Sequence, residues 1–439
     1  MVIGSWKTHC SRRAPAPAGR LDLGWAIALT ALAVSLAFSA CSRGSAEAPP
    51  EVLSLRHQIF STERYRELAD QWETHARAHS QDPFVFVEWG DALRYAGETG
   101  AANEKYRHAF ALDSTDARAI NAYVQMQCME HADGADWELS HGRLLRAAAT
   151  APENPEIYYN LWMTSMRTGR FEQAASSLER MVALGDISKP LYDYAYNMLA
   201  GAPPAAIIFT NGDNDTYPPL AIQVLEGVRP DVAIVNLSLL NTKWYIRYLR
   251  GKGLPITLGD AEIDALKATK DDLVSAQMQR HLYAQLEEAS WPRSICYAVT
   301  VYGSCKILPG RRLLEGLLER ILPGTEAAVV DAELDVARTR ELLDSVYRLD
   351  SITDPQIDWE REMAVAKLGT NYGVLLAKVG EALSMEEPPR DGAAYFQRAA
   401  QFLIFHEERE WLARILARWE ELDPENPQLR QLRAQPENP

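Results

Sequence analysis

Residues 89–114 carry a spacing of small and aromatic side chains that few folds accommodate. The stretch WGDALRYAGETGAANEKYRHAFALDS places its small, aromatic and aliphatic residues at Gly90, Gly97, Ala102, Tyr106, Ala109 and Leu112. Small residues at such positions let the two helices of a pair cross closely, and the aromatic ring fills the groove between neighbouring pairs. The spacing therefore predicts helix pairs that stack along the chain.

The same spacing recurs further along the chain. In residues 160–186 it falls on Gly169, Ala174, Leu178 and Leu184. A weaker copy between the two has its second helix marked by Ser140, Leu144, Ala147 and Pro152. Pro152 precedes Asp186 by 34 residues, which is one full repeat, and the pattern resembles the tetratricopeptide repeat. We predict a tetratricopeptide-type helical domain over residues 58–200; the alternative is a generic helical bundle.

From Ala202 the periodicity changes to short runs rich in β-branched residues. PPAAIIF and DVAIVNLSLL read as buried parallel strands, with a helix, PPLAIQVLEGV, between them. This order is a βαβ unit. A third strand is expected at Ser294–Gly303, and RRLLEGLLERILP is expected to form a helix that ends at Pro323. Residues 201–330 are thus predicted to be a small α/β domain with a Rossmann-like parallel sheet.

Residues 331–439 return to amphipathic helical patterns. The closing LDPENP repeats the APENP found at Ala151, a typical end for a tetratricopeptide repeat. We predict a C-terminal helical, repeat-like domain, so the fold class is α plus α/β: helical repeats, a small α/β domain, then helices again.

The N-terminus has the layout of an export signal. A basic leader precedes an apolar run, Leu23–Ala40, which ends in small residues before Cys41. The ending FSAC resembles a bacterial lipobox, which implies that residues 1–41 are a signal peptide, that Cys41 is lipidated and that residues 42–57 are a linker. Ser42 after the cysteine favours the outer membrane of a bacterial envelope, with the protein facing the periplasm. A transmembrane anchor and ordinary secretion are the alternatives.

Charge and cysteine content limit the function classes. A formal charge of -15 argues against a nucleic-acid partner, which needs a dense basic face. Beyond the leader and Cys41 the cysteines are Cys128, Cys296 and Cys305, an odd number that cannot form a disulfide framework. A bridge between Cys296 and Cys305 stays open. No zinc spacing and no complete catalytic motif is present, so we predict no catalytic residue, metal ligand or cofactor.

The sequence NGDNDT between the first predicted strand and helix is the strongest candidate for a site. Asp213-Asn214-Asp215 is a D-x-D pattern, which in many nucleotide-sugar transferases holds a divalent ion. Alternatively the stretch is a tight turn in which Asp215 or Thr216 caps the following helix. We favour the turn, and name Asp213, Asn214, Asp215 and Thr216 as candidate ligand-binding residues.

Two aromatic residues near the second strand complete the candidate set. Trp244 and Tyr245 could stack on a sugar, although such residues more often fill a helix–sheet interface. A glycan is therefore a candidate ligand beside protein partners.

Residues 205–323 resemble part of a known family. GDNDT, the strand RPDV…VNLSLL with the following WY, YAVTV and LLEGLLERILP are similar to the soluble segment of bacterial multi-pass membrane proteins of domain-of-unknown-function family 2723. That family is related to protein O-mannosyltransferases. Its transferase activity is attributed to a membrane-embedded region that this sequence lacks, so the resemblance implies an accessory domain only.

Together these features predict a membrane-tethered periplasmic interaction protein. Tetratricopeptide arrays bind protein partners in a concave groove, and the lipid at Cys41 would supply the membrane contact. The resemblance implies a role beside envelope glycan or protein-glycosylation machinery. The alternative is a sugar- or phosphate-ester-processing enzyme that uses residues 211–216, NGDNDT, which we call the acidic turn.

Overall fold

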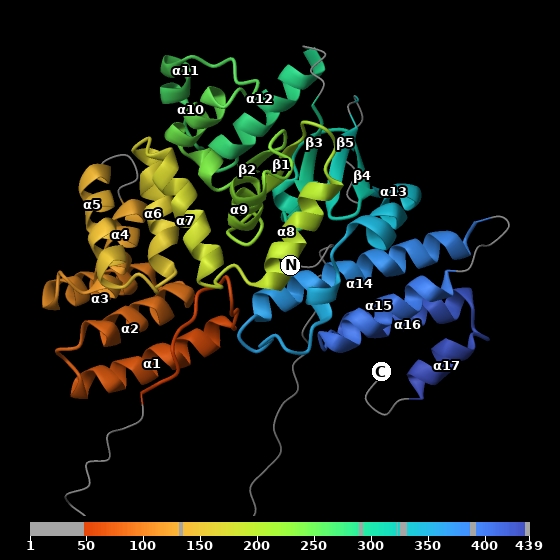
Figure 1. The fold of residues 1–439 in the computed structure, drawn as a ribbon, viewed down its shortest axis with the longest axis horizontal. Coiled ribbons are helices and arrows are strands. Elements are labelled where there is room, and N and C mark those ends of the chain that lie inside the picture. Colours follow the sequence, from red (N-terminus) through yellow and green to blue (C-terminus); the bar gives the residue numbers. More distant parts are fainter. Residues whose placement is uncertain are drawn as a thin grey trace, which may run out of the picture.

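The computed structural model describes residues 48–130, 135–288, 293–322, 324, 332–386 and 392–434. Its helices lie on two sides of a small sheet, with the N-terminal array on the left of Figure 1 and the C-terminal helices at the lower right. None of the described helices combines the length and the hydropathy needed to cross a membrane. The predicted signal peptide and Cys41 lie outside the described residues.

In the part of the chain that the structure describes, the N-terminal array contains eight helices. They are α1 Thr62–Ala78, α2 Pro83–Tyr95, α3 Thr99–Leu112, α4 Ala117–Glu130, α5 Trp137–Thr150, α6 Glu156–Arg167, α7 Phe171–Ala183 and α8 Lys189–Gly201. Sequential helices pack together in pairs, α2 with α3, α4 with α5 and α6 with α7. Loops this short leave sequential helices antiparallel.

The predicted reason for the small residues is visible in the first pair. A Cβ at Gly90 would lie 2.4 Å from Cε1 of Tyr106, so α2 and α3 can cross here only because Gly90 has no side chain. Gly97 joins the two helices at a φ of 88°, which favours glycine. The prediction of helical repeats is confirmed.

Several of these helices begin at a side-chain cap. The Ser61 hydroxyl accepts from the amide of Arg64, and the Asp82 carboxylate accepts from Phe84 with Pro83 following it. Asp136 caps α5 through the amide of Leu139. Each cap satisfies an amide that has no partner inside its helix, so local sequence determines where these helices start.

The sheet has six strands in the order β2-β1-β3-β5-β4-β6. They are β1 Ile207–Thr210, β2 Ala233–Asn236, β3 Ile295–Ala298, β4 Arg311–Glu315, β5 Leu318–Leu322 and β6 Glu333–Leu334. β1 pairs in parallel with β2 and β3, and α9 (Tyr217–Glu226) links β1 to β2. The predicted βαβ unit is confirmed. β5 is antiparallel to β3 and β4, so the sheet is mixed and the prediction of a parallel, Rossmann-like sheet was wrong.

The error arose at residues 311–322, which form a hairpin where the sequence predicted a helix. Glu315 pairs with Leu318 across a turn in which Gly316 has a φ of 59°. On the facing strands the buried side chains of Arg312 and Glu319 form an ion pair at 3.1 Å. The segment is rich in helix-forming residues, but pairing with β3 and the buried ion pair override that local preference.

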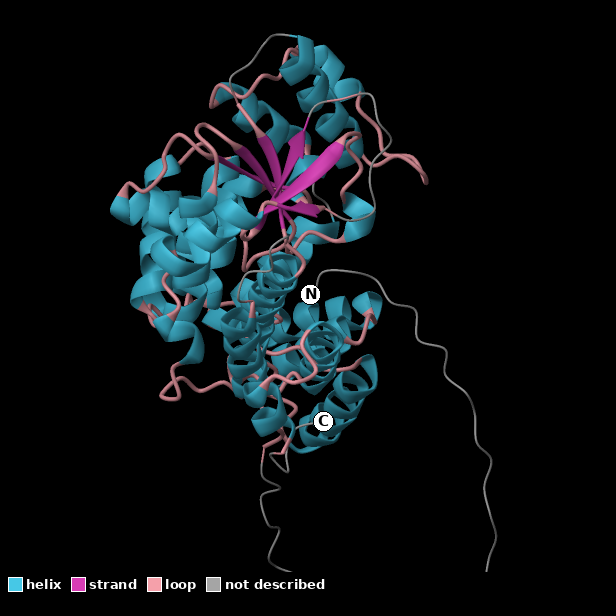
Figure 2. Ribbon diagram, turned by 90° about the vertical axis from the view of Figure 1, so that its right-hand side faces the viewer, coloured by secondary structure: helices cyan, strands magenta, loops and turns pink. Residues whose placement is uncertain are grey.

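Further helices cover the sheet and follow it. Around the sheet lie η1 Leu239–Asn241, α10 Lys243–Gly251, α11 Asp260–Ala265, α12 Val274–Glu288 and η2 Gly303–Cys305. After it come α13 Val336–Glu341, η3 Leu342–Val346, η4 Asp350–Thr353, α14 Met363–Ser384, α15 Ala393–Phe405, α16 Arg409–Leu422 and α17 Pro427–Arg433. Figure 2 shows the strands gathered above these C-terminal helices. α14 and α15 approach closely, because a Cβ on Gly380 would lie 2.9 Å from the Gly392 carbonyl oxygen.

One large core unites most of these elements. Buried apolar residues form a continuous cluster from Ala117 through the sheet to Leu429. A smaller cluster, from Val52 to Met126, holds α1, α2 and α3 together. Cys296 is buried in β3 and, like Cys305, carries a free thiol, so the bridge that the sequence left open is not formed.

Candidate functional site

The segment before the first helix is part of the folded structure. We call residues 50–60 the N-terminal strap; they belong to no helix or strand. The Pro50 carbonyl accepts from the Trp72 indole at 3.2 Å, and the Val52 amide donates to the Glu88 carboxylate at 2.7 Å. Further along, the His57 carbonyl accepts from the amide of Ala364 at 2.7 Å. The strap therefore ties the N-terminal array to the start of α14.

The strap carries an arginine into a cluster of acidic residues. The Arg56 guanidinium lies over the Tyr159 ring, 3.5 Å from its centroid. It pairs with Glu156, with Asp186 at 3.6 Å and with Asp213 at 3.4 Å. Burial by itself would lower the pKa of Arg56, but these carboxylates outweigh it and raise the pKa. Arg56 is therefore a permanent positive charge that stabilises three carboxylates from three different elements.

His57 extends this arrangement. Its Nε2 lies 2.9 Å from Asp186 and its Nδ1 lies 3.1 Å from Glu362. Burial lowers the pKa of His57, but hydrogen bonds to Asp186 and Glu362 more than offset it and raise the pKa to about 9. The imidazole is therefore protonated at neutral pH. We call this group the Arg56 cluster, which comprises Arg56, His57, Glu156, Tyr159, Asp186, Asp213 and Glu362.

The acidic turn meets the strap at this cluster. Asp213 is half exposed and its carboxylate faces Arg56. The side-chain amide of Asn214 donates to the backbone carbonyl of Arg56 at 2.8 Å. Asp215 is buried, and its carboxylate accepts from the amides of Asn211 and Gly212 and from the Thr300 hydroxyl. Burial is the main cause that raises the pKa of Asp215.

The carboxylates of the D-x-D pattern thus engage different partners. Asp213 contacts the strap, whereas Asp215 holds the turn together from inside. Among the described residues, no group of three or more His, Cys, Asp and Glu side chains is arranged to hold a metal ion. Asp213 therefore lies against the strap, whereas Asp215 is buried.

The capping role considered for this turn is wrong in its detail. Thr216 stands at the N-cap of α9 without a side-chain bond to a helix amide. Its hydroxyl instead lies 2.8 Å from that of Thr210 and accepts from the Asn236 amide at 2.9 Å. Thr216 therefore links the carboxyl ends of β1 and β2, and Asp215 faces back towards the start of the turn.

The rings of the two candidate aromatic residues pack edge to face, with centroids 5.4 Å apart, but the residues differ in burial. Tyr245 is buried, with its hydroxyl 3.3 Å from the Ile234 carbonyl, and it packs α10 onto β2. Trp244 is only partly buried, and the Arg167 guanidinium lies 5.6 Å from its ring centroid. The structure therefore brings neither aromatic residue to the Arg56 cluster.

A cavity of about 940 Å³ lies between the strap, α2, α4 and the loops that follow α3 and α5. Apolar side chains contribute to its wall, among them Val52, Phe84 and Val87. Acidic side chains line it at Glu51, Glu88, Asp91, Asp113, Asp116, Glu153, Glu156 and Asp186, against Arg94, Arg118, Arg361 and His57. The acidic residues outnumber the basic ones, and the cavity borders the Arg56 cluster at Glu156 and Asp186.

The carboxyl of Glu88, which is buried, and that of Asp91, which is partly buried, lie at the wall of this cavity. Burial raises the pKa of Glu88 to about 8, and Arg118 is its nearest cation at 3.7 Å. Burial also raises the pKa of Asp91, which accepts from the Tyr106 hydroxyl at 2.7 Å. Glu88 is thus mostly protonated at neutral pH, and the exposed carboxylates provide most of the negative charge.

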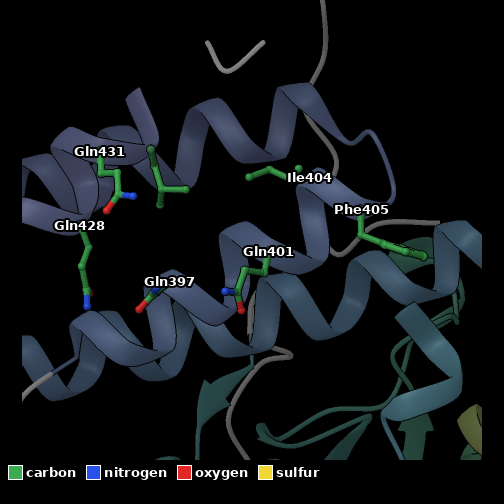
Figure 3. Close-up of a pocket in the computed structure, with 7 residues that line it drawn as sticks. Gln397, Gln401, Ile404, Phe405, Gln428 and Gln431 are labelled. Carbon is green, nitrogen blue, oxygen red and sulfur yellow. The ribbon is translucent and has the colours of Figure 1, made fainter. Parts of the chain in front are cut away.

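A second, smaller cavity of about 390 Å³ lies in the C-terminal region. Figure 3 shows Gln397 and Gln401 of α15 on one side, with Gln428 and Gln431 of α17 on the other. The other described residues of its wall, Ile404, Phe405 and Leu432, are apolar, so none of the described lining residues is charged. The two cavities therefore differ in charge as well as in size.

Comparisons with known proteins find a family match in the central part of the chain. Residues 191–278 match the family model of TMEM260-associated domain 2. A stretch of 54 residues is 32% identical to the Protein O-mannosyl-transferase tmem260 of Dictyostelium discoideum, covering 12% of this chain and 7% of that protein. The chain thus matches only a small part of this relative, and the resemblance to O-mannosyltransferase-like proteins is supported for the central segment.

Two solved structures show a weak likeness to the chain. A crystal structure of MamA covers 40% of this chain and 89% of its own, at 17% identity and a TM-score of 0.25. Yeast Tom70 covers 87% of this chain and 63% of its own, at 11% identity and a TM-score of 0.25. These likenesses are too weak to identify the repeats, which are instead visible in the packing of α2 against α3.

Sequence reasoning missed the Arg56 cluster because its members lie far apart in the chain. Residues 42–57 read as a polar linker, yet the stretch LSLRHQIF alternates apolar residues with Arg56 and His57. That apolar content was the available signal of a packed segment. The partners of Arg56, up to 157 residues away, left no comparable signal.

Proposed function

We propose that this chain is a scaffold that binds an extended polypeptide in the cavity of its N-terminal helical array. The strap is the observation that supports this most directly. It is itself a stretch of irregular chain that is seated on α1 and α2 through a backbone amide, a backbone carbonyl and the apolar Val52. Helical repeats commonly offer such concave surfaces to partners. The open part of the cavity would hold a partner's chain beside the strap.

Photo-crosslinking in cells tests this proposal. A photoreactive residue at Gln125, which lines the cavity, is expected to form adducts with a small set of polypeptides. The matched control is Glu179, an exposed residue of α7 outside the cavity. Identical adduct patterns from both positions, or no adduct from Gln125, would contradict the proposal.

We also propose that the chain is lipid-anchored at Cys41 in a bacterial envelope and faces the periplasm. The support is the sequence of the leader: basic residues, an apolar run and a small-residue ending before the cysteine. Metabolic labelling with a palmitate analogue is expected to mark the wild type and not Cys41→Ala. Retention of the label in the variant would refute the anchor.

A link to glycosylation is the third element of the proposal. Its support is the similarity of residues 191–278 to TMEM260-associated domain 2, a match that runs from α8 into α12. We propose that this part acts as an accessory to envelope glycan or protein-glycosylation machinery. Glycan staining of envelope proteins from cells without this chain tests the link, and an unchanged pattern would break it while leaving polypeptide binding intact. No observation favours the metal-dependent enzyme alternative, because Asp213 and Asp215 engage different partners.

A further inference from the structure

We infer that the polypeptide bound in the N-terminal cavity is a cationic segment of another protein, one whose arginine side chains enter the cavity beside the strap. This inference rests on the proposed function and specifies its ligand class. It draws on two independent observations: the charge of the cavity wall, and the way in which the fold already holds an arginine at its edge.

The wall has exposed carboxylates whose charge is not fully compensated by ion pairs within the protein. Glu153 is exposed at the loop before α6, and no described residue forms an ion pair with it. The Glu156 side chain is 41% exposed even though it pairs with Arg56. Both acids line the cavity, so an incoming cation would meet negative charge that water and Arg56 only partly compensate.

The second observation is the seat of Arg56. Its guanidinium stacks on Tyr159 and contacts carboxylates on α6, before α8 and in the acidic turn. An arginine suits such a site because its planar group can stack and pair with carboxylates together. Because Glu156 and Asp186 also line the cavity, the seat forms one end of it. The fold thus shows how an arginine from an irregular segment is bound at this surface.

Side-chain amides supply what a peptide backbone needs. Asn121 and Gln125 of α4 and Asn154 before α6 line the same cavity. Side-chain amides can donate hydrogen bonds to and accept them from the main chain of an extended peptide, whatever its sequence. Acids would then select the charge of the ligand, and the amides would fix its path.

The experiment measures binding of three labelled decapeptides to the full chain in detergent at pH 7, by fluorescence anisotropy. The peptides alternate serine with arginine, with glutamine or with glutamate. We expect the arginine peptide to bind at least tenfold more tightly than the glutamine peptide, with the preference falling as salt rises. Glu153→Lys is expected to weaken the arginine peptide by about fivefold, the scale of an exposed ion pair.

A matched control and a competitor make the result decisive. Glu172→Lys changes an equally exposed acid of α7 outside the cavity and should leave binding unchanged. Equal binding of the arginine and glutamine peptides would overturn the inference and leave polypeptide binding standing. Tighter binding after Arg43→Gln would show that the chain's own upstream segment is the occupant, which also overturns it. Failure of all three peptides, with every variant, would refute the proposed function as well.

Discussion

The helical regions on the two sides of the sheet use the same packing device and present different surfaces. In the N-terminal array, α2 and α3 cross closely because Gly90 leaves room for the Tyr106 ring. In the C-terminal region, Gly380 and Gly392 allow the same close approach of α14 and α15. The N-terminal cavity is large, acidic and bordered by the strap, whereas the C-terminal one is small and lined by glutamines. Close helix crossing therefore sets the shape of an array, and the residues on its walls and the strap set its chemistry.

The largest expected difference between the two regions concerns their arginines. Arg56→Ala would leave His57 as the remaining cation beside the buried Asp186 and would remove the stack on Tyr159, so it should lower the free energy of unfolding by about 3 kcal/mol. Arg418→Ala removes an exposed arginine that pairs with Glu381 and Glu421, and should cost less than about 1 kcal/mol. Urea denaturation of both variants measures the difference, and equal losses would show that the strap does not stabilise the fold.

The two regions should also respond to pH in opposite directions. The pKa of His57 is raised from 6.5 to about 9, so the folded protein binds a proton more tightly than the unfolded chain. Its contribution is complete below pH 6.5 and is lost as pH rises from 6.5 to 9, by at most about 3 kcal/mol. His57→Gln should remove this alkaline decline in the free energy of unfolding. A decline that persists unchanged in the variant would contradict the assignment.

His406 of the C-terminal region supplies the contrast. Burial lowers its pKa to about 4, so the unfolded chain binds the proton more tightly. Its effect is absent above pH 6.5, and stability is lost as pH falls from 6.5 towards 4. Subtracting the pH profile of His406→Gln from that of the wild type isolates this acid-side loss from the titration of carboxylates. A flat difference between pH 6.5 and 4 would disprove it.

A smaller effect tests the shared packing device. Gly90→Ala should destabilise the N-terminal array by about 1–3 kcal/mol, because the new methyl overlaps the Tyr106 ring. Gly142→Ala in α5 is the matched control: nothing lies within 4 Å of the added methyl, so better helix propensity should stabilise the protein by up to about 1 kcal/mol. Thermal unfolding of the two variants gives the signs. Adding Tyr106→Leu to Gly90→Ala should recover part of the loss.

The smallest effect is expected at Asp213, and its neighbour Asp215 provides the contrast within the same turn. Asp213→Asn weakens one half-exposed ion pair and should cost less than about 1 kcal/mol. Asp215→Ala should cost about 1–3 kcal/mol, because the partly buried amides of Asn211 and Gly212 lose their acceptor. Millimolar magnesium, manganese or calcium should leave the melting temperature of the wild type unchanged. A metal-dependent rise that disappears in Asp213→Asn would restore the enzyme alternative.

Local spacing in the sequence was enough for the helical repeats and for the first βαβ unit. Gly90 and Tyr106 are close in sequence and meet across a single turn, so their pattern carries the contact. Likewise β1, α9 and β2 follow one another within 30 residues, from Ile207 to Asn236. Interactions this short depend on residue type and spacing, which a sequence states directly.

Only the tertiary structure decided the hairpin and the site. Residues 311–322 have the composition of a helix, but they form two strands, of which β5 pairs with β3 and β4 pairs with β5. Arg56 meets Glu156, Asp186 and Asp213 from 100 to 157 residues away, and the two aspartates of one turn end in opposite surroundings. Such contacts depend on how whole elements pack. Local sequence patterns do not identify partners that are so far apart in the chain.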